Sequence, residues 1–192
     1  MPKQKLKMAQ TPSNMLALGT KAPFFELPNP AKKNQAQSLD ELKGEKGTLV
    51  IFMCNHCPFV IHVIDKLAEL YEDYKPQGIE FIAINANDVE KYPADSPELM
   101  VDFAQEKGFA FPYLFDDSQA IAKAYDAACT PDFYFFDDKL DLVYRGQMDD
   151  SRPGNQKEVT GEDLIIAFEN LLSGNPQEDL QKPSIGCNIK WK

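Results

Sequence analysis

Two cysteines three residues apart, Cys54 and Cys57, stand between a short apolar run and an amphipathic segment. The run at residues 48–53 is apolar, rich in β-branched residues and preceded by Gly47, which is typical of a buried central strand. Apolar residues then recur at spacings of three and four as far as Tyr74, which predicts a helix. A second apolar run follows at 79–85. Strand, helix and strand in this order predict parallel pairing and an α/β fold.

The rest of the chain extends this unit to a complete small domain. Ser96 and Pro97 are typical of a helix start, and Gly108 of its end. Further expected elements are a strand within 18–30, a helical turn at 39–42, a helix at 118–126, an antiparallel hairpin of strands 132–136 and 140–145, and a helix at 164–172 after a capping box at 160–163.

These elements predict one α/β domain, with a mixed central sheet and helices on both faces. Its bounds are expected at 18–173, after a polar N-terminal arm at 1–17. Residues 174–192 form a C-terminal tail with little periodicity. Because the tail carries Ile189 and the lone tryptophan, Trp191, it is expected to pack on the domain; the alternative is a docking peptide for a partner.

Charge and composition exclude several classes of protein. The net charge is −10 and the chain has only two arginines, Arg145 and Arg152, so neither a nucleic acid nor an anionic membrane is an expected partner. No apolar stretch approaches the roughly 20 residues of a membrane-spanning helix, and the polar start lacks the apolar centre of a secretory signal. A cytoplasmic protein is expected. Four cysteines are too few for a disulfide-rich secreted scaffold.

The position of Cys54 and Cys57 suits disulfide exchange. A thiol at a helix N-terminus is acidified by the helix dipole and by free backbone N–H groups, and the thiolate is the nucleophile in exchange. On this basis Cys54 is predicted to attack and Cys57 to resolve the mixed disulfide. His56, between them, either stabilises a thiolate when protonated or simply fills a turn position.

Zinc binding is the competing use of two cysteines at this spacing, and it requires about two more ligands. Cys129 and Cys187 are isolated in the sequence, and the second histidine, His62, falls on the polar face of the predicted helix. His62 is therefore interpreted as an ordinary surface residue. Neither a metal nor an organic cofactor is expected.

The sequence resembles the thioredoxin-like superfamily, in the redoxin branch grouped with alkyl hydroperoxide reductases and thiol-specific antioxidants. The motifs that carry the resemblance are residues 18–28, Cys54-Asn55-His56-Cys57-Pro58, Cys129-Thr130-Pro131-Asp132-Phe133, residues 142–146 and the tail 184–192. The second and the last of these place it near a bacterial subgroup called thioredoxin family protein. The resemblance implies that Pro131 is a cis-proline facing the cysteines and keeping metals from them. It also implies that the backbone of Thr130 pairs with an extended substrate.

Two departures limit the resemblance. Thioredoxin has a buried aspartate six residues before its first cysteine, where this chain has Thr48, and its intervening pair is not Asn-His. Redoxin peroxidases place a threonine three residues before the reactive cysteine, where this chain has Ile51. The copper-chaperone branch has a histidine further along the chain, and none follows His62.

The expected function is thiol–disulfide exchange by Cys54 and Cys57 on a protein or small-molecule substrate, with reducing equivalents from another dithiol. A monomer or weak dimer is expected. The alternatives are a peroxiredoxin-like antioxidant peroxidase and a redox-inactive peptide-binding module. Cys129 and Cys187 are either buried apolar residues or additional redox thiols, the latter if the tail folds back toward the motif. Loops 87–97 and 149–155 either border a substrate groove or are ordinary surface.

Overall fold

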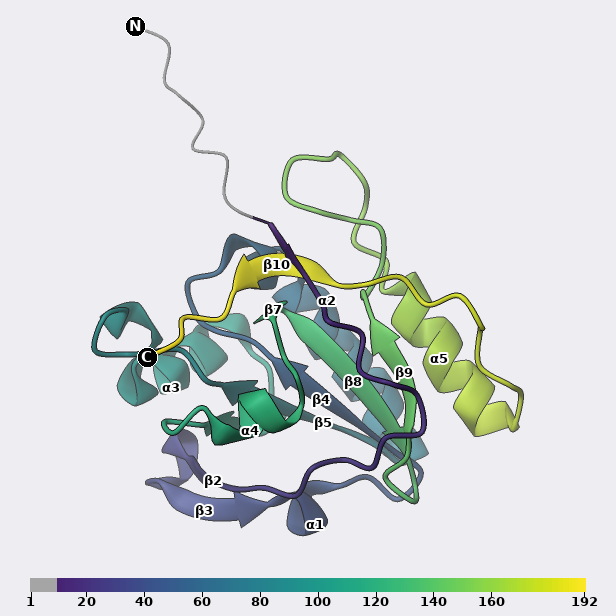
Figure 1. Ribbon diagram of the computed structural model, residues 1–192, viewed down its shortest axis with the longest axis horizontal. Helices are drawn as coiled ribbons and strands as arrows, with labels where there is room; N and C mark the ends of the chain where they lie inside the picture. Colours follow the sequence, from purple (N-terminus) through teal and green to yellow (C-terminus); the bar gives the residue numbers. More distant parts are fainter. Residues whose placement is uncertain (1–9) are drawn as a thin grey trace, which may run out of the picture.

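The computed structural model describes residues 10–192, and its centre is a five-stranded sheet of order β6-β5-β4-β8-β9 (Figure 1). The expected mixed sheet is confirmed: one half is parallel and the other half is an antiparallel hairpin. The strands are β4 (Gly47–Phe52), β5 (Ile79–Asn85), β6 (Tyr113–Phe115), β8 (Asp132–Asp137) and β9 (Leu142–Gly146).

Side chains of β4 alternate between two apolar cores, because successive residues of a strand point to opposite faces. Leu49 and Ile51 face the core under α2 (Pro58–Tyr74), α3 (Pro97–Lys107) and α5 (Glu162–Ser173). Val50 and Phe52 face the core under α4 (Ala120–Ala124) and the N-terminal segment. Helices therefore cover both faces, as the sequence predicted.

Helix α2 begins at Pro58, and Cys57 is its N-cap. Proline favours the first helical position because its fixed φ suits the helix and its missing N–H would be unpaired there. Eight side chains of α2 are buried in the core, at the spacing expected from the sequence. The start of α2 thus fixes Cys57 against the sheet.

The start of α5 differs from the expectation. The predicted capping box at Thr160 is wrong, because Gly161 occupies the N-cap with a φ of 72° and no side chain caps the helix. Instead, the Asp149 carboxylate accepts the backbone N–H groups of Thr160 and Gly161, at 2.8 and 2.7 Å. A carboxylate from a distant loop therefore takes the role expected of the local threonine.

The N-terminal region forms a hairpin of β2 (Glu26–Asn29) and β3 (Gln35–Ser38), joined by the 3₁₀ turn Pro30–Lys32. The short helix α1 (Leu39–Leu42) follows, with a complete capping box between Ser38 and Glu41. Helix α3 starts with the Ser96 cap and ends at Gly108, as predicted. The β2–β3 hairpin lies beside β6.

The C-terminal tail contains a strand that sequence periodicity does not indicate. β10 (Ile185–Asn188) pairs antiparallel with β1 (Thr11–Pro12) on one side and with β7 (Cys129–Thr130) on the other. Figure 1 shows β10, in yellow, crossing beside β7, and its residues also lie against α2. Residues 11 and 12 of the predicted polar arm are therefore held by the tail, whereas residues 1–9 lie outside the described residues. Between residues 10 and 192, no helix is long and apolar enough to cross a membrane.

Candidate active site

The structure brings Cys54, Cys57 and Thr130 together at the carboxyl end of β4. The Cys57 Sγ lies 3.2 Å from the backbone oxygen of Thr130, and the Cys54 Sγ lies 3.7 Å from the Thr130 hydroxyl. The Thr130–Pro131 peptide bond is cis, as the resemblance implies. Both motif cysteines are buried, with at most 1% of either residue exposed.

Cys57, rather than Cys54, occupies the helix N-terminus. Thiol hydrogen bonds from Cys187 and then from Cys54 lower the pKa of Cys57 to about 2, with a smaller contribution from the Val60 N–H in the first turn of α2. The pKa of Cys54 is raised, first by its hydrogen bond to Cys57, then by burial and by the charge of Asp95. Of the two motif thiols, Cys57 is therefore the one whose surroundings favour loss of the proton.

Cys187 is the third sulfur of the site. Its Sγ lies 2.9 Å from the Cys57 Sγ, and its residue is paired with Thr130 in the β10–β7 ladder. The hydrogen bond with Cys57 and partial burial raise the pKa of Cys187. Cys187 is only partly buried, in contrast to the two motif cysteines. The tail therefore covers the motif and presents its own thiol at the surface of the site.

Cys129 is not in contact with the sulfurs of Cys54, Cys57 and Cys187. Its thiol lies 3.6 Å from the Pro131 oxygen and 4.0 Å from the Ser184 oxygen, and burial raises its pKa. Of the two additional cysteines named from the sequence, the structure brings Cys187 to the motif and leaves Cys129 as a buried thiol against backbone carbonyls.

His56 faces a buried carboxylate that sequence reasoning missed. The His56 Nδ1 lies 2.7 Å from the Asp95 Oδ2, although the ring N–H does not point along a hydrogen bond, and the ring stacks on Tyr92. Asp95 is fully buried and accepts hydrogen bonds from the Asn55 N–H and the Asn87 Nδ2. The only sequence signal for it is the polar segment that follows the apolar strand β5 directly.

The Cys54, His56 and Asp95 side chains offer three donors within 4.8 Å of one another, which could serve as metal ligands. A structural zinc site takes four protein ligands and a catalytic one takes three. Here both Asp95 oxygens already accept hydrogen bonds from Asn55 and Asn87. We therefore assign Asp95 to holding the turn that contains Asn55 and His56.

Loop 149–155 closes one side of the site, and it changes the interpretation of His62. The Nε2 of His62 lies 2.7 Å from the Ser151 hydroxyl, and both side chains lie in a small cleft that Pro131 also lines. His62 was expected to be an ordinary surface residue, and it is instead partly buried and bonded to this loop. The loop therefore borders the cis-proline.

A family model described as Redoxin matches residues 17–164. The chain belongs to the Redoxin family. Similar solved structures are those of an uncharacterized conserved protein from Geobacillus kaustophilus and a hypothetical protein from Sinorhizobium meliloti 1021. The first is 54% identical to this redoxin, with a TM-score of 0.94. The match covers 97% of this redoxin and 98% of that chain. The second is 46% identical with a TM-score of 0.92 and covers 95% and 98%.

A curated relative is the thiol-disulfide oxidoreductase ResA of Halalkalibacterium halodurans, which is 30% identical over 112 residues. The match covers 58% of this redoxin and 58% of that relative, so little more than half of its length is shared. A putative thiol:disulfide interchange protein DsbE from Chlorobium tepidum, at 20% identity and a TM-score of 0.63, shares the fold; the match covers 82% of this redoxin and 99% of that chain.

Two further buried polar residues, Thr48 and Asp132, bear on the comparison with thioredoxin. Thr48 stands where thioredoxin has its buried acid, and its hydroxyl accepts the Gly44 N–H at 3.0 Å. Asp132 follows the cis-proline and accepts the Tyr134 hydroxyl at 3.0 Å. Burial raises the pKa of Asp132 to about 6. The buried acid next to the cis-proline is thus Asp132 on β8. On β4, where thioredoxin has its acid, the Thr48 hydroxyl holds a backbone N–H instead.

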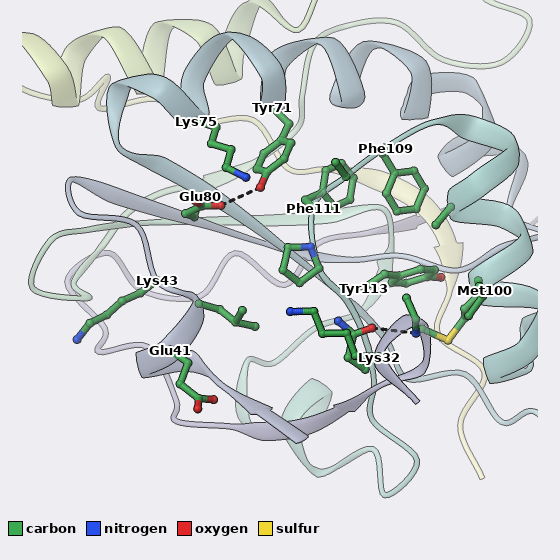
Figure 2. Close-up of a pocket in the computed structure, with 17 residues that line it drawn as sticks. Lys32, Glu41, Lys43, Tyr71, Lys75, Glu80, Met100, Phe109, Phe111 and Tyr113 are labelled. Carbon is green, nitrogen blue, oxygen red and sulfur yellow. Dashed lines mark hydrogen bonds between the residues drawn. The ribbon is translucent and has the colours of Figure 1, made fainter. Parts of the chain in front are cut away.

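A separate cavity of about 490 Å³ opens between the β2–β3 hairpin, α3 and the end of α2. Figure 2 shows Lys32, Lys43 and Lys75 around it, with the Tyr71 hydroxyl bonded to Glu80. None of its described lining residues is a cysteine. Its wall includes Tyr113, whose hydroxyl donates to the Asn55 Oδ1 at 2.9 Å, so one side chain supports both the cavity and the motif.

Proposed function

We propose that this redoxin is a thiol–disulfide oxidoreductase that uses Cys54 and Cys57 as its redox couple. The observation that carries the proposal is the environment of Cys57. Cys57 is the N-cap of α2, and its thiol donates to the Thr130 oxygen beside the cis-proline and lies 2.9 Å from the Cys187 Sγ. Loss of the proton from a thiol in this position gives the thiolate, which is the reactive species of disulfide exchange.

We assign Cys57 as the attacking thiolate and Cys54 as the thiol that resolves it. The sequence predicted the opposite order, on the premise that Cys54 stands at the helix N-terminus. That premise fails because Pro58 starts the helix, which gives the N-cap to Cys57. The pKa of Cys54 is raised and that of Cys57 is lowered, so Cys57 is the thiol that loses its proton first.

The substrate class is a protein or small-molecule disulfide, and electrons come from a second dithiol. The curated relative named thiol-disulfide oxidoreductase supports this class of reaction. In this proposal His56, held between Asp95 and Tyr92, tunes the couple, and an extended partner would use the surface at Thr130 and Pro131 in place of β10. A cytoplasmic location is part of the proposal, and cell fractionation tests it.

The decisive experiment is a redox titration in glutathione buffers, with the cysteine state read by alkylation and mass spectrometry. In the wild-type protein, formation of the 54–57 disulfide should follow a two-electron transition. Cys54→Ser and Cys57→Ser should each abolish that transition. Cys129→Ala is the matched control and should retain the transition. Absence of any such transition in the wild-type protein refutes the proposal and favours the redox-inactive binding module.

A peroxide assay separates this function from the peroxidase. Ile51 occupies the position where the resemblance places the peroxidase threonine. We expect peroxide consumption no faster than that by free cysteine, together with catalysed reduction of a model protein disulfide by dithiothreitol. Fast peroxide consumption that depends on Cys57 assigns the chain to the peroxidases instead.

A further inference from the structure

The C-terminal strand occupies the surface that an extended substrate would use. Cys187 faces Thr130 in the β10–β7 ladder, and the Ile189 N–H donates to the Ala128 oxygen at 3.2 Å. The Ser184 hydroxyl donates to the Pro131 oxygen at 2.6 Å. The chain itself therefore satisfies the backbone groups around the cis-proline, and an external strand cannot pair there while β10 is bound.

The fit between the tail and this surface is close. A Cβ on Gly186 would lie 1.9 Å from the Thr130 oxygen, so glycine at this position is what allows the two backbones to touch. Ile189 is 1% exposed, in the core under α4 and the N-terminal segment. The Lys190 N–H donates to the Asn87 Oδ1 at 2.9 Å. Breaking these contacts costs burial as well as hydrogen bonds, so the closed arrangement is the stable one.

Exposure and distance then give the three sulfurs an order. Cys54 and Cys57 are buried, and Cys187 is the partly exposed member, with its Sγ 2.9 Å from that of Cys57. A bulky disulfide or dithiol outside the protein therefore meets Cys187 first. The distance is short enough for exchange between Cys187 and Cys57 after small side-chain movements.

We propose that Cys187 is a third catalytic thiol, which carries disulfides between the buried Cys54–Cys57 couple and protein substrates at the surface. The proposal rests on the proposed function of that couple. In this proposal, Cys187 on β10 exchanges with Cys57 in the position that an external substrate would otherwise occupy.

The steps need no additional oxidant when the couple is oxidised. The Cys187 thiolate attacks the Cys57 sulfur, so that the Cys57–Cys187 bond forms, the Cys54–Cys57 bond breaks and Cys54 leaves as a thiolate that takes up the proton lost by Cys187. A thiolate of a dithiol substrate then attacks the Cys187 sulfur and releases Cys57 as a thiolate. The second substrate thiolate attacks the substrate sulfur of this mixed disulfide and releases Cys187. The substrate is oxidised by two electrons and the 54–57 pair is reduced; the reverse sequence reduces a substrate disulfide.

The first test compares Cys187→Ser with Cys129→Ala in the full chain, using a reduced dithiol protein as the substrate. Serine retains a hydroxyl donor toward Cys57 and removes only the sulfur. We expect Cys187→Ser to slow oxidation of the substrate by about ten-fold or more, because an internal thiol reacts at high effective concentration. The potential of the 54–57 couple should stay at its wild-type value, and Cys129→Ala should exchange at the wild-type rate.

The second test opens the site by Gly186→Ala, which forces β10 away from Thr130. In this background, an additional Cys187→Ser should cost little, because the substrate reaches Cys57 directly. A tail that is only a cover predicts the opposite pattern: Cys187→Ser exchanges like the wild type and Gly186→Ala alone is faster. That pattern overturns the relay and leaves the Cys54–Cys57 function standing, whereas loss of the 54–57 transition itself refutes the function.

Peptide mapping supplies a readout that does not depend on rate. Oxidation of Cys54→Ser with diamide should give a 57–187 disulfide, and Cys54→Ser/Cys187→Ser should give no intramolecular disulfide. If Cys54→Ser forms only intermolecular links or a link to Cys129, the two sulfurs do not exchange and the relay is wrong.

Discussion

The Nδ1 of His56 lies 2.7 Å from the Oδ2 of Asp95, a carboxylate that is fully buried 39 residues further along the chain. Asp95 also receives the Asn55 N–H at 2.9 Å and the Asn87 Nδ2 at 2.8 Å. One side chain therefore fixes both intervening residues of the Cys54–Cys57 motif. This relationship ties the turn between the two cysteines to the loop that carries Asp95.

Asp95→Asn should destabilise the protein by about 1–3 kcal/mol, because an amide nitrogen would face either the Asn55 N–H or the Asn87 amide as donor against donor. It should also lower the raised pKa of Cys54 by removing the carboxylate charge, while the contributions of the Cys57 hydrogen bond and of burial remain. Urea denaturation measures the first effect and the pH dependence of Cys54 alkylation the second. Asp117→Asn, at an exposed salt bridge with Lys192, is the control and should change neither.

Thr48→Val tests whether Thr48 replaces the buried acid of thioredoxin in proton transfer. The Thr48 hydroxyl accepts the Gly44 N–H, and its loss leaves a buried donor unpaired. We expect a loss of about 1–3 kcal/mol in the free energy of unfolding and an unchanged potential of the 54–57 couple. Thr20→Val, at an exposed hydroxyl bonded to Ala17, should be close to neutral in both measurements. A changed potential would show that Thr48 influences the 54–57 couple.

The sequence predicted the elements that have strong local signals. The β4–α2–β5 unit follows from apolar periodicity, and α3 from the Ser96 cap and Gly108. The sequence did not predict β10, because a strand of four residues has too short a pattern and its pairing partners lie far away in the chain. Thr160 had the right local pattern for a cap, but the distant Asp149 carboxylate took its place.

The candidate site was predicted in part for the same reason. Cys54, Cys57 and the cis-proline were recognisable from motifs, but the contact between Cys57 and Cys187 joins residues separated by 130 positions. Asp95 lies in a polar loop with no pattern to distinguish it from surface acids. Pro58 is a local signal for the helix start, because proline favours the first helical position, and it points to Cys57 rather than Cys54 as the N-cap.

Cys187→Ala should raise the lowered pKa of Cys57, because the hydrogen bond with Cys187 is the largest cause of the lowering. A hydrogen bond to a charged group contributes about 1.5–3 kcal/mol, which corresponds to a rise of about one to two pH units. The ultraviolet absorbance of the thiolate, followed from neutral to acidic pH, measures the change. Cys187→Ser keeps a donor and should stay near the wild type. Equal titration of all three proteins would mean that Cys187 does not donate to Cys57.

Asp132 should make stability depend on pH in a direction opposite to that of most carboxylates. Its pKa is raised to about 6 by burial, above the value of 3.8 for a free aspartate, so the folded protein binds the proton more tightly than the unfolded chain does. The favourable contribution is therefore complete below about pH 4 and is lost as the pH rises through 6. Because one pKa unit corresponds to about 1.4 kcal/mol, the charged form costs about 3 kcal/mol above that range.

Asp132→Asn removes this dependence, since an amide does not ionise. Relative to the wild type, the variant should therefore gain up to about 3 kcal/mol in stability between pH 4 and pH 7. The Tyr134 hydroxyl retains an acceptor in the amide oxygen, so the comparison isolates the charge. Asp73→Asn, on the exposed face of α2, is the control and should follow the wild type throughout. Urea denaturation at a series of pH values decides the point, and a constant difference between the Asp132 variant and the wild type would show that Asp132 keeps its charge on both sides of the unfolding transition.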